Sequence, residues 1–305
     1  MKIAIIGGAG SVGAPTAFYL AAQKLADEIL MIGGKQQNVL KQHAMDLSTA
    51  MSAKNIIIRA GDYQDLEGTD IVINAAGIAQ GLITDRMEML PKNIVLIKAI
   101  AAHIKRQCPD AFVITATNPV DPLNYATYLA GGFDRKKLIG YSLNDSFRFR
   151  EMIAKGYNMK VSRVGGIVIG EHGTAQVPLF STVRIDGKIV NVAEDIKRSV
   201  FQTIPTILRD YEGLRAGRTA GWTCAIGLEL IVRAVVENSG IVLPCSVVLE
   251  GEYGLKGLSI SVPVALGRTG VQQIVEYNLE KDEQERFEIA SGLLFDAVKK
   301  VESYL

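Results

Sequence analysis

Apolar residues in the first half of the chain form short runs that alternate with longer stretches of helical spacing. The short apolar runs predict buried strands at Lys2–Ile6, Glu28–Ile32, Asn55–Arg59, Ile71–Asn74 and Ala111–Thr115. The stretches between them predict helices at Val12–Leu25, Gln37–Leu47 and Lys92–Gln107. Strands and helices in alternation are typical of a doubly wound parallel sheet, which we expect over residues 1–140.

The order of predicted elements changes near Gly140. Helices are predicted at Ser142–Tyr157, Arg218–Asn238 and Lys281–Tyr304, a strand at Val164–Ile169 and a hairpin at Val183–Val190. Asp186-Gly187 supplies the tight turn of that hairpin. The mixed order predicts a second, α+β domain over residues 141–305, so the fold class is a Rossmann-type α/β domain followed by a substrate or catalytic domain.

Composition restricts the class of partner. The 305 residues are 48% hydrophobic, enough for a large core, and the formal net charge of +1 gives no reason to expect nucleic acid. The three cysteines are odd in number and far apart, which fits a reducing compartment, and no apolar stretch is long enough to span a membrane. We expect a cytoplasmic protein whose partners are small molecules and copies of itself.

A glycine-rich turn follows the first predicted strand. Its residues Gly8, Gly10, Ser11, Val12 and Gly13 belong to a G-x-G-x-x-G pattern that opens the first helix. The glycines permit a tight turn and a close backbone approach to a pyrophosphate, which the helix N-terminus then faces. The pattern in this position predicts a dinucleotide site.

The end of the second strand bears on the choice of dinucleotide. An acidic residue usually stands there and binds the adenosine ribose, but this chain has Gly33, Gly34 and Lys35. Loss of the carboxylate together with gain of a cation favours a 2′-phosphorylated cofactor, NADP, and leaves NAD open. The alternative is that Lys35 is a solvated loop residue.

One of the three histidines stands out by its position. His172 lies between Gly170 and Gly173 at the end of an apolar run, a place suited to a base that works near neutral pH. Upstream, Asp145 and Arg148 are three residues apart on a predicted helix and so face the same side. Taken alone, these residues are also compatible with a structural histidine and a surface ion pair. No metal-ligand spacing is present.

The order and spacing of six motifs resemble those of the lactate/malate dehydrogenase family, nearly from end to end. The motifs are Gly8–Gly13, Gly77–Arg86, Thr117–Asp121, Asp145–Arg148, Gly170–Gly173 and Ala225–Gly227. The resemblance implies reversible hydride transfer between NAD(P) and a small (S)-2-hydroxy acid. It also implies a homodimer or homotetramer.

The resemblance assigns a task to each matching residue. His172 is then the proton-transfer base, Asp145 its carboxylate partner, and Arg148 the group that binds the substrate carboxylate. Arg86 closes with its loop and polarises the reacting carbonyl. The remaining matches are cofactor contacts, with Asn118 also contacting substrate: Gly77, Asn93, Asn118 and Ile226.

The substrate is less well indicated. Gln80 stands where malate enzymes of the family carry arginine, so the missing charge favours a lactate-like monocarboxylate. Trp222 occupies the back of the expected pocket, where a small residue is usual, and Asn144 replaces the usual leucine. Malate remains the alternative, with Arg218 as a source of a second cation or as a solvent-facing residue.

Two other classes compete with this interpretation. A non-catalytic nucleotide-binding protein should have lost its catalytic positions, yet the matching residues are all present. A short-chain reductase should carry a Tyr-x-x-x-Lys pair after a core strand, but Tyr19, Tyr125 and Tyr128 all lack a lysine four residues further on.

Overall fold

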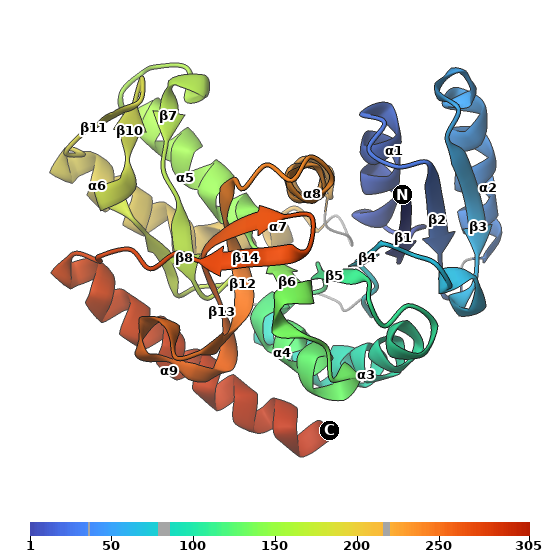
Figure 1. Ribbon diagram of the computed structural model, residues 1–305. Helices are drawn as coiled ribbons and strands as arrows, with labels where there is room; N and C mark the ends of the chain where they lie inside the picture. Colours follow the sequence, from blue (N-terminus) through green and yellow to red (C-terminus); the bar gives the residue numbers. More distant parts are fainter. Residues whose placement is uncertain (36, 79–85, 216–219) are drawn as a thin grey trace.

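The first half of the chain folds as a parallel sheet with helices on both faces. The computed structural model describes residues 1–35, 37–78, 86–215 and 220–305. Within these ranges the sheet has the order β3-β2-β1-β4-β5-β6, all parallel (Figure 1). The strands are β1 (Lys2–Ile6), β2 (Glu28–Ile32), β3 (Ile57–Gly61), β4 (Ile71–Asn74), β5 (Phe112–Thr115) and β6 (Leu138–Tyr141). This order confirms the predicted doubly wound sheet.

Alternation of side chains along the strands explains why helices cover both faces. Ile3 and Ile5 of β1 belong to a buried cluster that includes residues of α1 and α2, whereas Ala4 and Ile6 pack with residues of α3. Since neighbouring side chains of a strand point to opposite faces, one strand contributes to both layers. The helices of this half are α1 (Gly13–Ala22), α2 (Gln37–Ala50), α3 (Leu90–Gln107) and α4 (Val120–Gly131).

The second half extends the same sheet instead of forming a separate one. β12 pairs antiparallel with β6, through Cys245 opposite Tyr141 and Ser246 opposite Gly140, and the described strands make one 11-stranded sheet. Its further strands are β12 (Val242–Glu250), β13 (Lys256–Gly267), β14 (Gly270–Ile274), β8 (Val168–Gly170) and β9 (Gln176–Pro178). A small sheet holds β7 (Val164–Gly165), β10 (Arg184–Ile185) and β11 (Lys188–Ile189).

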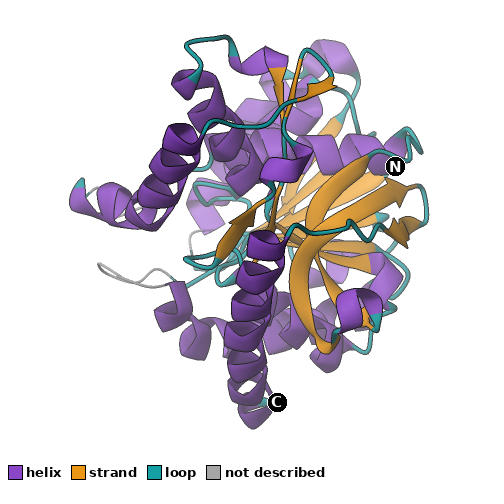
Figure 2. Ribbon diagram, turned by 90° about the vertical axis from the view of Figure 1, so that its left-hand side faces the viewer, coloured by secondary structure: helices purple, strands orange, loops and turns teal. Residues whose placement is uncertain are grey.

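The helices of the second half surround these strands. They are α5 (Leu143–Gly156), α6 (Glu194–Thr203), α7 (Ile207–Gly213), α8 (Trp222–Val236) and α9 (Lys281–Tyr304). A capping box between Glu280 and Glu283 begins α9, which runs as one long helix in front of the sheet (Figure 2). None of the helices in the described ranges is long and apolar enough to cross a membrane.

One predicted strand is wrong in its extent. The run Val164–Ile169 is not a single strand, because the chain leaves the small sheet after Gly165 and enters the large one at Val168. Gly166, at φ +157°, lies at this change of sheet. The predicted hairpin is present as β10 and β11, and it packs against β7.

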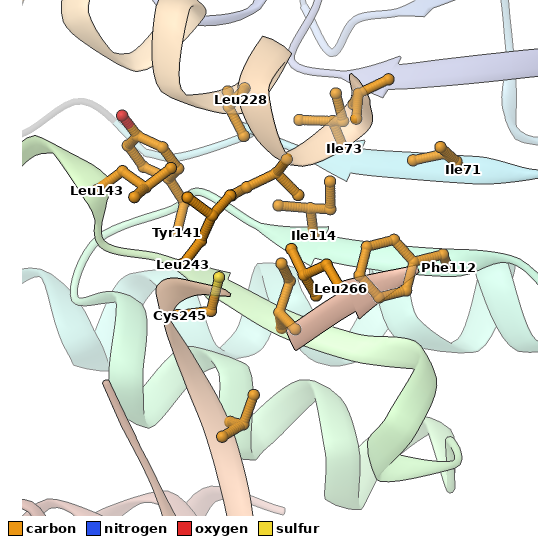
Figure 3. Close-up of a cluster of buried hydrophobic side chains, with 14 of the residues drawn as sticks. Ile71, Ile73, Phe112, Ile114, Tyr141, Leu143, Leu228, Leu243, Cys245 and Leu266 are labelled. Atoms are coloured by element: carbon orange, nitrogen blue, oxygen red, sulfur yellow. The ribbon is translucent and has the colours of Figure 1, made fainter. Parts of the chain in front are cut away.

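A shared hydrophobic cluster joins the two halves. Figure 3 shows Ile73 and Ile114 from the parallel strands beside Tyr141, Leu228 of α8 and Leu243 of β12. All five side chains are at most 9% exposed. Because this cluster lies under α8, it fixes that helix against the carboxyl ends of the parallel strands, where the functional residues lie.

Candidate active site

The glycine-rich turn lies against the end of the neighbouring strand. The backbone N–H groups of Gly7 and Gly8 both donate to Ile32 O, at 2.8 and 2.9 Å. The chain that leaves β2 therefore passes the turn at once, with Gly33 half-buried and Gly34 and Lys35 exposed. The predicted cofactor residues of these two segments are thus brought together at one edge of the sheet.

Close packing around the turn explains two glycines. A Cβ at Gly13 would lie 2.3 Å from Gly7 O, and a Cβ at Gly221 would lie 1.9 Å from Ser11 O. The first contact lets α1 begin directly under the turn, and the second brings the start of α8 against it. The turn thus combines a tight backbone, an exposed Gly10 and a helix N-terminus. A bound pyrophosphate requires all three features.

We expect Gly13→Ala to lower both the melting temperature and the affinity for dinucleotide. The added methyl group must displace backbone, and overpacking of this kind costs about 1–3 kcal/mol. Thermal unfolding with and without NADH measures both effects. Gly34→Ala is the matched control for the melting temperature, because a Cβ there meets nothing within 4 Å. An equal melting temperature for the two variants would contradict the packing argument.

His172 forms the centre of the site. It follows β8, is 4% exposed, and its Nδ1 lies 2.6 Å from Asp145 Oδ2, in the first turn of α5. An ionised carboxylate can only accept a hydrogen bond, so Nδ1 carries the hydrogen. The other ring nitrogen, Nε2, is then the atom available for proton transfer.

Burial dominates the electrostatics of this pair. Desolvation lowers the pKa of His172 below its ordinary value, although Asp145 acts in the opposite direction. Burial by itself would raise the pKa of Asp145, but His172, Arg86 and Arg148 together hold it below its ordinary value. The pair therefore rests as a neutral imidazole beside a carboxylate, ready to accept a proton.

Two guanidinium groups flank the histidine. Arg148 Nη1 lies 3.5 Å from Asp145 Oδ1, is buried, and has no hydrogen-bond partner among the described residues. Its guanidinium carbon lies 5.7 Å from the centre of the Tyr211 ring on α7. Arg86 opens the 3₁₀ turn Arg86–Met89, and its Nη1 donates to His172 O at 3.0 Å. A buried donor without a partner, next to a base, suits an anionic substrate.

The side chain of Asn93 links two loops at the edge of the sheet. Its Nδ2 donates to Asn118 O at 2.8 Å, and its Oδ1 accepts from Ile78 N at 2.8 Å. The amide of Asn93, which we predicted as a cofactor contact, thus joins the backbone beside Gly77 to that of Asn118. Asn118 Oδ1 is buried and lacks a protein partner within the described ranges, so it is free to bind a ligand.

The start of α8 carries the remaining predicted residues. Ile226 is 41% exposed and Trp222 is 71% exposed. The described residues therefore do not enclose the indole of Trp222, although the sequence placed it at the back of a pocket. Gln80 and Arg218 lie outside the described residues.

A polar chain that sequence reasoning missed joins α5 to α8. Tyr141 OH donates to Asn144 Oδ1 at 2.7 Å, and Asn144 Nδ2 donates to Cys224 Sγ at 3.2 Å. The unusual asparagine was visible in the sequence, but its partners were not. Asp121 was also missed as a contact of the histidine: its Oδ2 accepts from His172 N at 2.7 Å.

Taken together, these groups can bind an anion and transfer a proton to or from it. They lie beside a glycine-rich turn whose shape suits a dinucleotide. Residues 1–140 match the family model described as lactate/malate dehydrogenase, NAD binding domain. Residues 143–305 match the one described as lactate/malate dehydrogenase, alpha/beta C-terminal domain.

Individual relatives match over nearly the whole chain. A malate dehydrogenase of Natronomonas pharaonis is 35% identical over 303 residues, which are 98% of this chain and 99% of the relative. The solved malate dehydrogenase of Cryptosporidium parvum superimposes with a TM-score of 0.93 at 28% identity and covers 99% of both chains. The lactate dehydrogenase of the same organism, solved with lactic acid and nicotinamide adenine dinucleotide, gives 0.87 at 28% identity, over 99% of this chain and 98% of that one.

Proposed function

The chain belongs to the lactate/malate dehydrogenase family, whose members are oxidoreductases acting on a CH–OH group, and on this premise we propose that it interconverts a small (S)-2-hydroxy acid and the matching 2-oxo acid. Residues 1–140 would bind the nicotinamide cofactor and residues 141–305 the substrate. The observation that carries the proposal is the buried His172–Asp145 pair, with Arg148 beside it.

The residues present fit a nicotinamide cofactor. Close packing of Gly13 against Gly7 shapes a tight turn at the start of α1, and Asn118 Oδ1 is buried without a protein partner among the described residues. The Gly8–Gly13 turn would hold the pyrophosphate and Ile226 would pack on the nicotinamide. When bound, the cofactor accepts or supplies the hydride.

The chain's own residues handle the proton and the charge. In oxidation, Nε2 of His172 takes the hydroxyl proton, and Asp145 orients the ring and stabilises the imidazolium. Arg148 binds the substrate carboxylate through two parallel N–H donors, and Arg86 faces the oxygen on which negative charge develops. In reduction, His172 returns the proton to that oxygen.

Turnover tests this proposal directly. The purified protein is mixed with NADH or NADPH and a 2-oxo acid, and the loss of reduced cofactor is followed by absorbance. We expect turnover with at least one acid of the panel below. Cofactor binding without turnover of any acid would favour a non-catalytic nucleotide-binding protein instead.

The comparisons favour malate over the lactate-like substrate that Gln80 suggested. Several similar proteins are named malate dehydrogenase, while others are named L-lactate dehydrogenase. We therefore propose malate and oxaloacetate as the first substrate pair, with the monocarboxylate as the second candidate because glutamine carries no charge. A panel of oxaloacetate, pyruvate and larger 2-oxo monocarboxylates decides between them by kcat/KM. A preference for oxaloacetate that Arg218→Ala removes, with pyruvate unaffected, would identify the second cation.

Gly33-Gly34-Lys35 supports NADP, whereas the similar lactate dehydrogenase is described with NAD. We expect Lys35→Ala to lower kcat/KM for NADPH by roughly ten- to a hundredfold and to leave NADH unchanged, because a charged hydrogen bond contributes about 1.5–3 kcal/mol. Kinetics with both cofactors measure the ratio. A preference for NADH that Lys35→Ala does not alter would reject NADP.

Self-association is the last part of the proposal. The family resemblance supports a homodimer or homotetramer. Light scattering coupled to size exclusion gives the mass in solution, and a monomer at assay concentration would contradict this part alone.

A further inference from the structure

Asp121 lies next to the catalytic base but takes no part in the chemistry described above. It stands in the first turn of α4, is 1% exposed, and its Oδ2 accepts a hydrogen bond from the backbone N–H of His172 at 2.7 Å. The two residues are 51 positions apart in the chain, so the contact joins two separate elements.

Side chains hold His172 at three of its atoms. Asp121 accepts from its N–H, Arg86 donates to its carbonyl oxygen, and Asp145 accepts from its Nδ1. The ring bond alone leaves the backbone free to shift, whereas the two backbone contacts fix the point from which the ring projects. A buried N–H that loses its acceptor is costly, so the backbone would move to find another.

On the basis of the proposed function, we propose that Asp121 is a positioning residue for His172, which keeps Nε2 within reach of the substrate hydroxyl. A displacement of the base of about 1 Å can lower the rate by about 10²-fold. The contact acts through the backbone of His172, so it should affect kcat more than the KM of the acid.

The surroundings of Asp121 supply a second readout. The pKa of Asp121 is raised to about 7, chiefly by burial and also by the charges of Glu171 and Asp145, while hydrogen bonds from Ser246 and the His172 N–H act to lower it. The titratable groups that face Asp121 come from the segment after β8 (Glu171, His172) and from α5 (Asp145). Arg86 contacts the carbonyl of the same histidine.

Two variants of similar shape separate positioning from packing. Asp121→Asn keeps an oxygen that accepts the His172 N–H but removes the charge. Asp121→Leu keeps the approximate shape and removes the acceptor. For each we measure kcat and KM between pH 6 and 9, and the ring signals of ¹⁵N-histidine-labelled protein. His43 and His103, the other histidines of the chain, serve as internal references, and His172→Asn assigns the remaining signal.

We expect Asp121→Leu to lower kcat by tenfold to about a hundredfold with little change in KM, and to shift the Nδ1–H signal of His172. Asp121→Asn should match the wild type at low pH and diverge as the pH rises past the raised pKa of Asp121, about 7, because the ionised carboxylate is a stronger acceptor for the His172 N–H than an amide oxygen. If Asp121→Leu does not fold, the pH-dependent divergence and the ring signal of Asp121→Asn decide the matter.

The inference is overturned if both variants have only a lower melting temperature, while kcat, its pH profile and the His172 ring signal remain as in the wild type. Its failure is distinct from that of the proposed function. If His172→Asn retained full turnover, His172 would not be the base, but the ring signals would still test the Asp121 contact.

Discussion

His172→Gln is expected to lower kcat for 2-oxo acid reduction by about 10²–10⁴-fold, the usual contribution of a positioned acid or base. Glutamine has a comparable length and hydrogen-bonding ability but cannot carry the proton. Dinucleotide binding should persist, because the glycine-rich turn is formed by other elements. Steady-state kinetics and a fluorescence titration with NADH measure the two properties.

The control for this variant is His43→Gln. His43 lies half-buried on α2, which carries none of the catalytic residues proposed above. Its replacement should leave kcat unchanged. Equal activity of His172→Gln and wild type would remove the histidine from the mechanism and leave the pair as a structural feature.

The lowered pKa of His172 adds a pH dependence to the first result. Oxidation of the hydroxy acid needs the neutral imidazole, so its kcat/KM rises with pH through the pKa of the free enzyme. Because burial lowers that pKa, the plateau should begin at a lower pH than a histidine of ordinary pKa, 6.5, would give. A profile whose midpoint lies above 6.5 would contradict the electrostatics of the site.

Arg148→Lys is expected to lower kcat/KM for the acid by roughly thirtyfold, or about 2 kcal/mol, mainly through KM. Lysine keeps the charge but loses the planar fork that binds both carboxylate oxygens. Initial rates against acid concentration measure the effect, and the dissociation constant for NADH should remain unchanged.

A neighbouring arginine provides the matched control. Arg150 lies two residues further along α5, where its Nε donates to Ser146 O and its guanidinium covers the Phe147 ring. Arg150→Lys should affect stability more than KM. If the two variants raised KM equally, the buried Nη1 of Arg148, which has no hydrogen-bond partner in the described part of the chain, would not be the substrate-binding group.

Most elements of the first half could be predicted because each is indicated by the residue pattern of its own stretch of sequence. β1, β2 and β4 begin and end where the apolar runs do. The strands are buried on both faces, so their sequences are almost continuously apolar and contrast with the amphipathic helices between them.

Prolines account for three elements that the sequence did not predict, two strands of the second half and one helix of the first. β12 and β13 were not predicted, although they are long, and Pro244 of one lies opposite Pro263 of the other. Proline inside a central strand normally argues against that assignment. α4 was missed for a similar reason, since Pro119 and Pro122 flank its first turn, where a helix tolerates them.

The residues of the candidate site also fall into two groups: those that the local sequence indicates and those that only the fold brings together. Asp145 and Arg148 could be placed on one helix face from their spacing, and His172 could be singled out by the glycines around it. The contact between Asn144 and Cys224 spans 80 residues, and that between Asp121 and His172 spans 51. Such pairs depend on how α4, α5 and α8 meet over the shared cluster, which no local pattern encodes.

The pairing of β6 with β12 sets a rule for building chimaeras from this family. A natural splice between the two matched regions falls at residues 140–143, directly at this pair of strands. A Cβ at Gly140 would lie 2.8 Å from Ser246 Cβ and 2.6 Å from Val120 Cγ1. When the half after the splice is taken from another member of the family, its residue opposite position 140 should therefore be small. This requirement comes before the choice of any active-site residue.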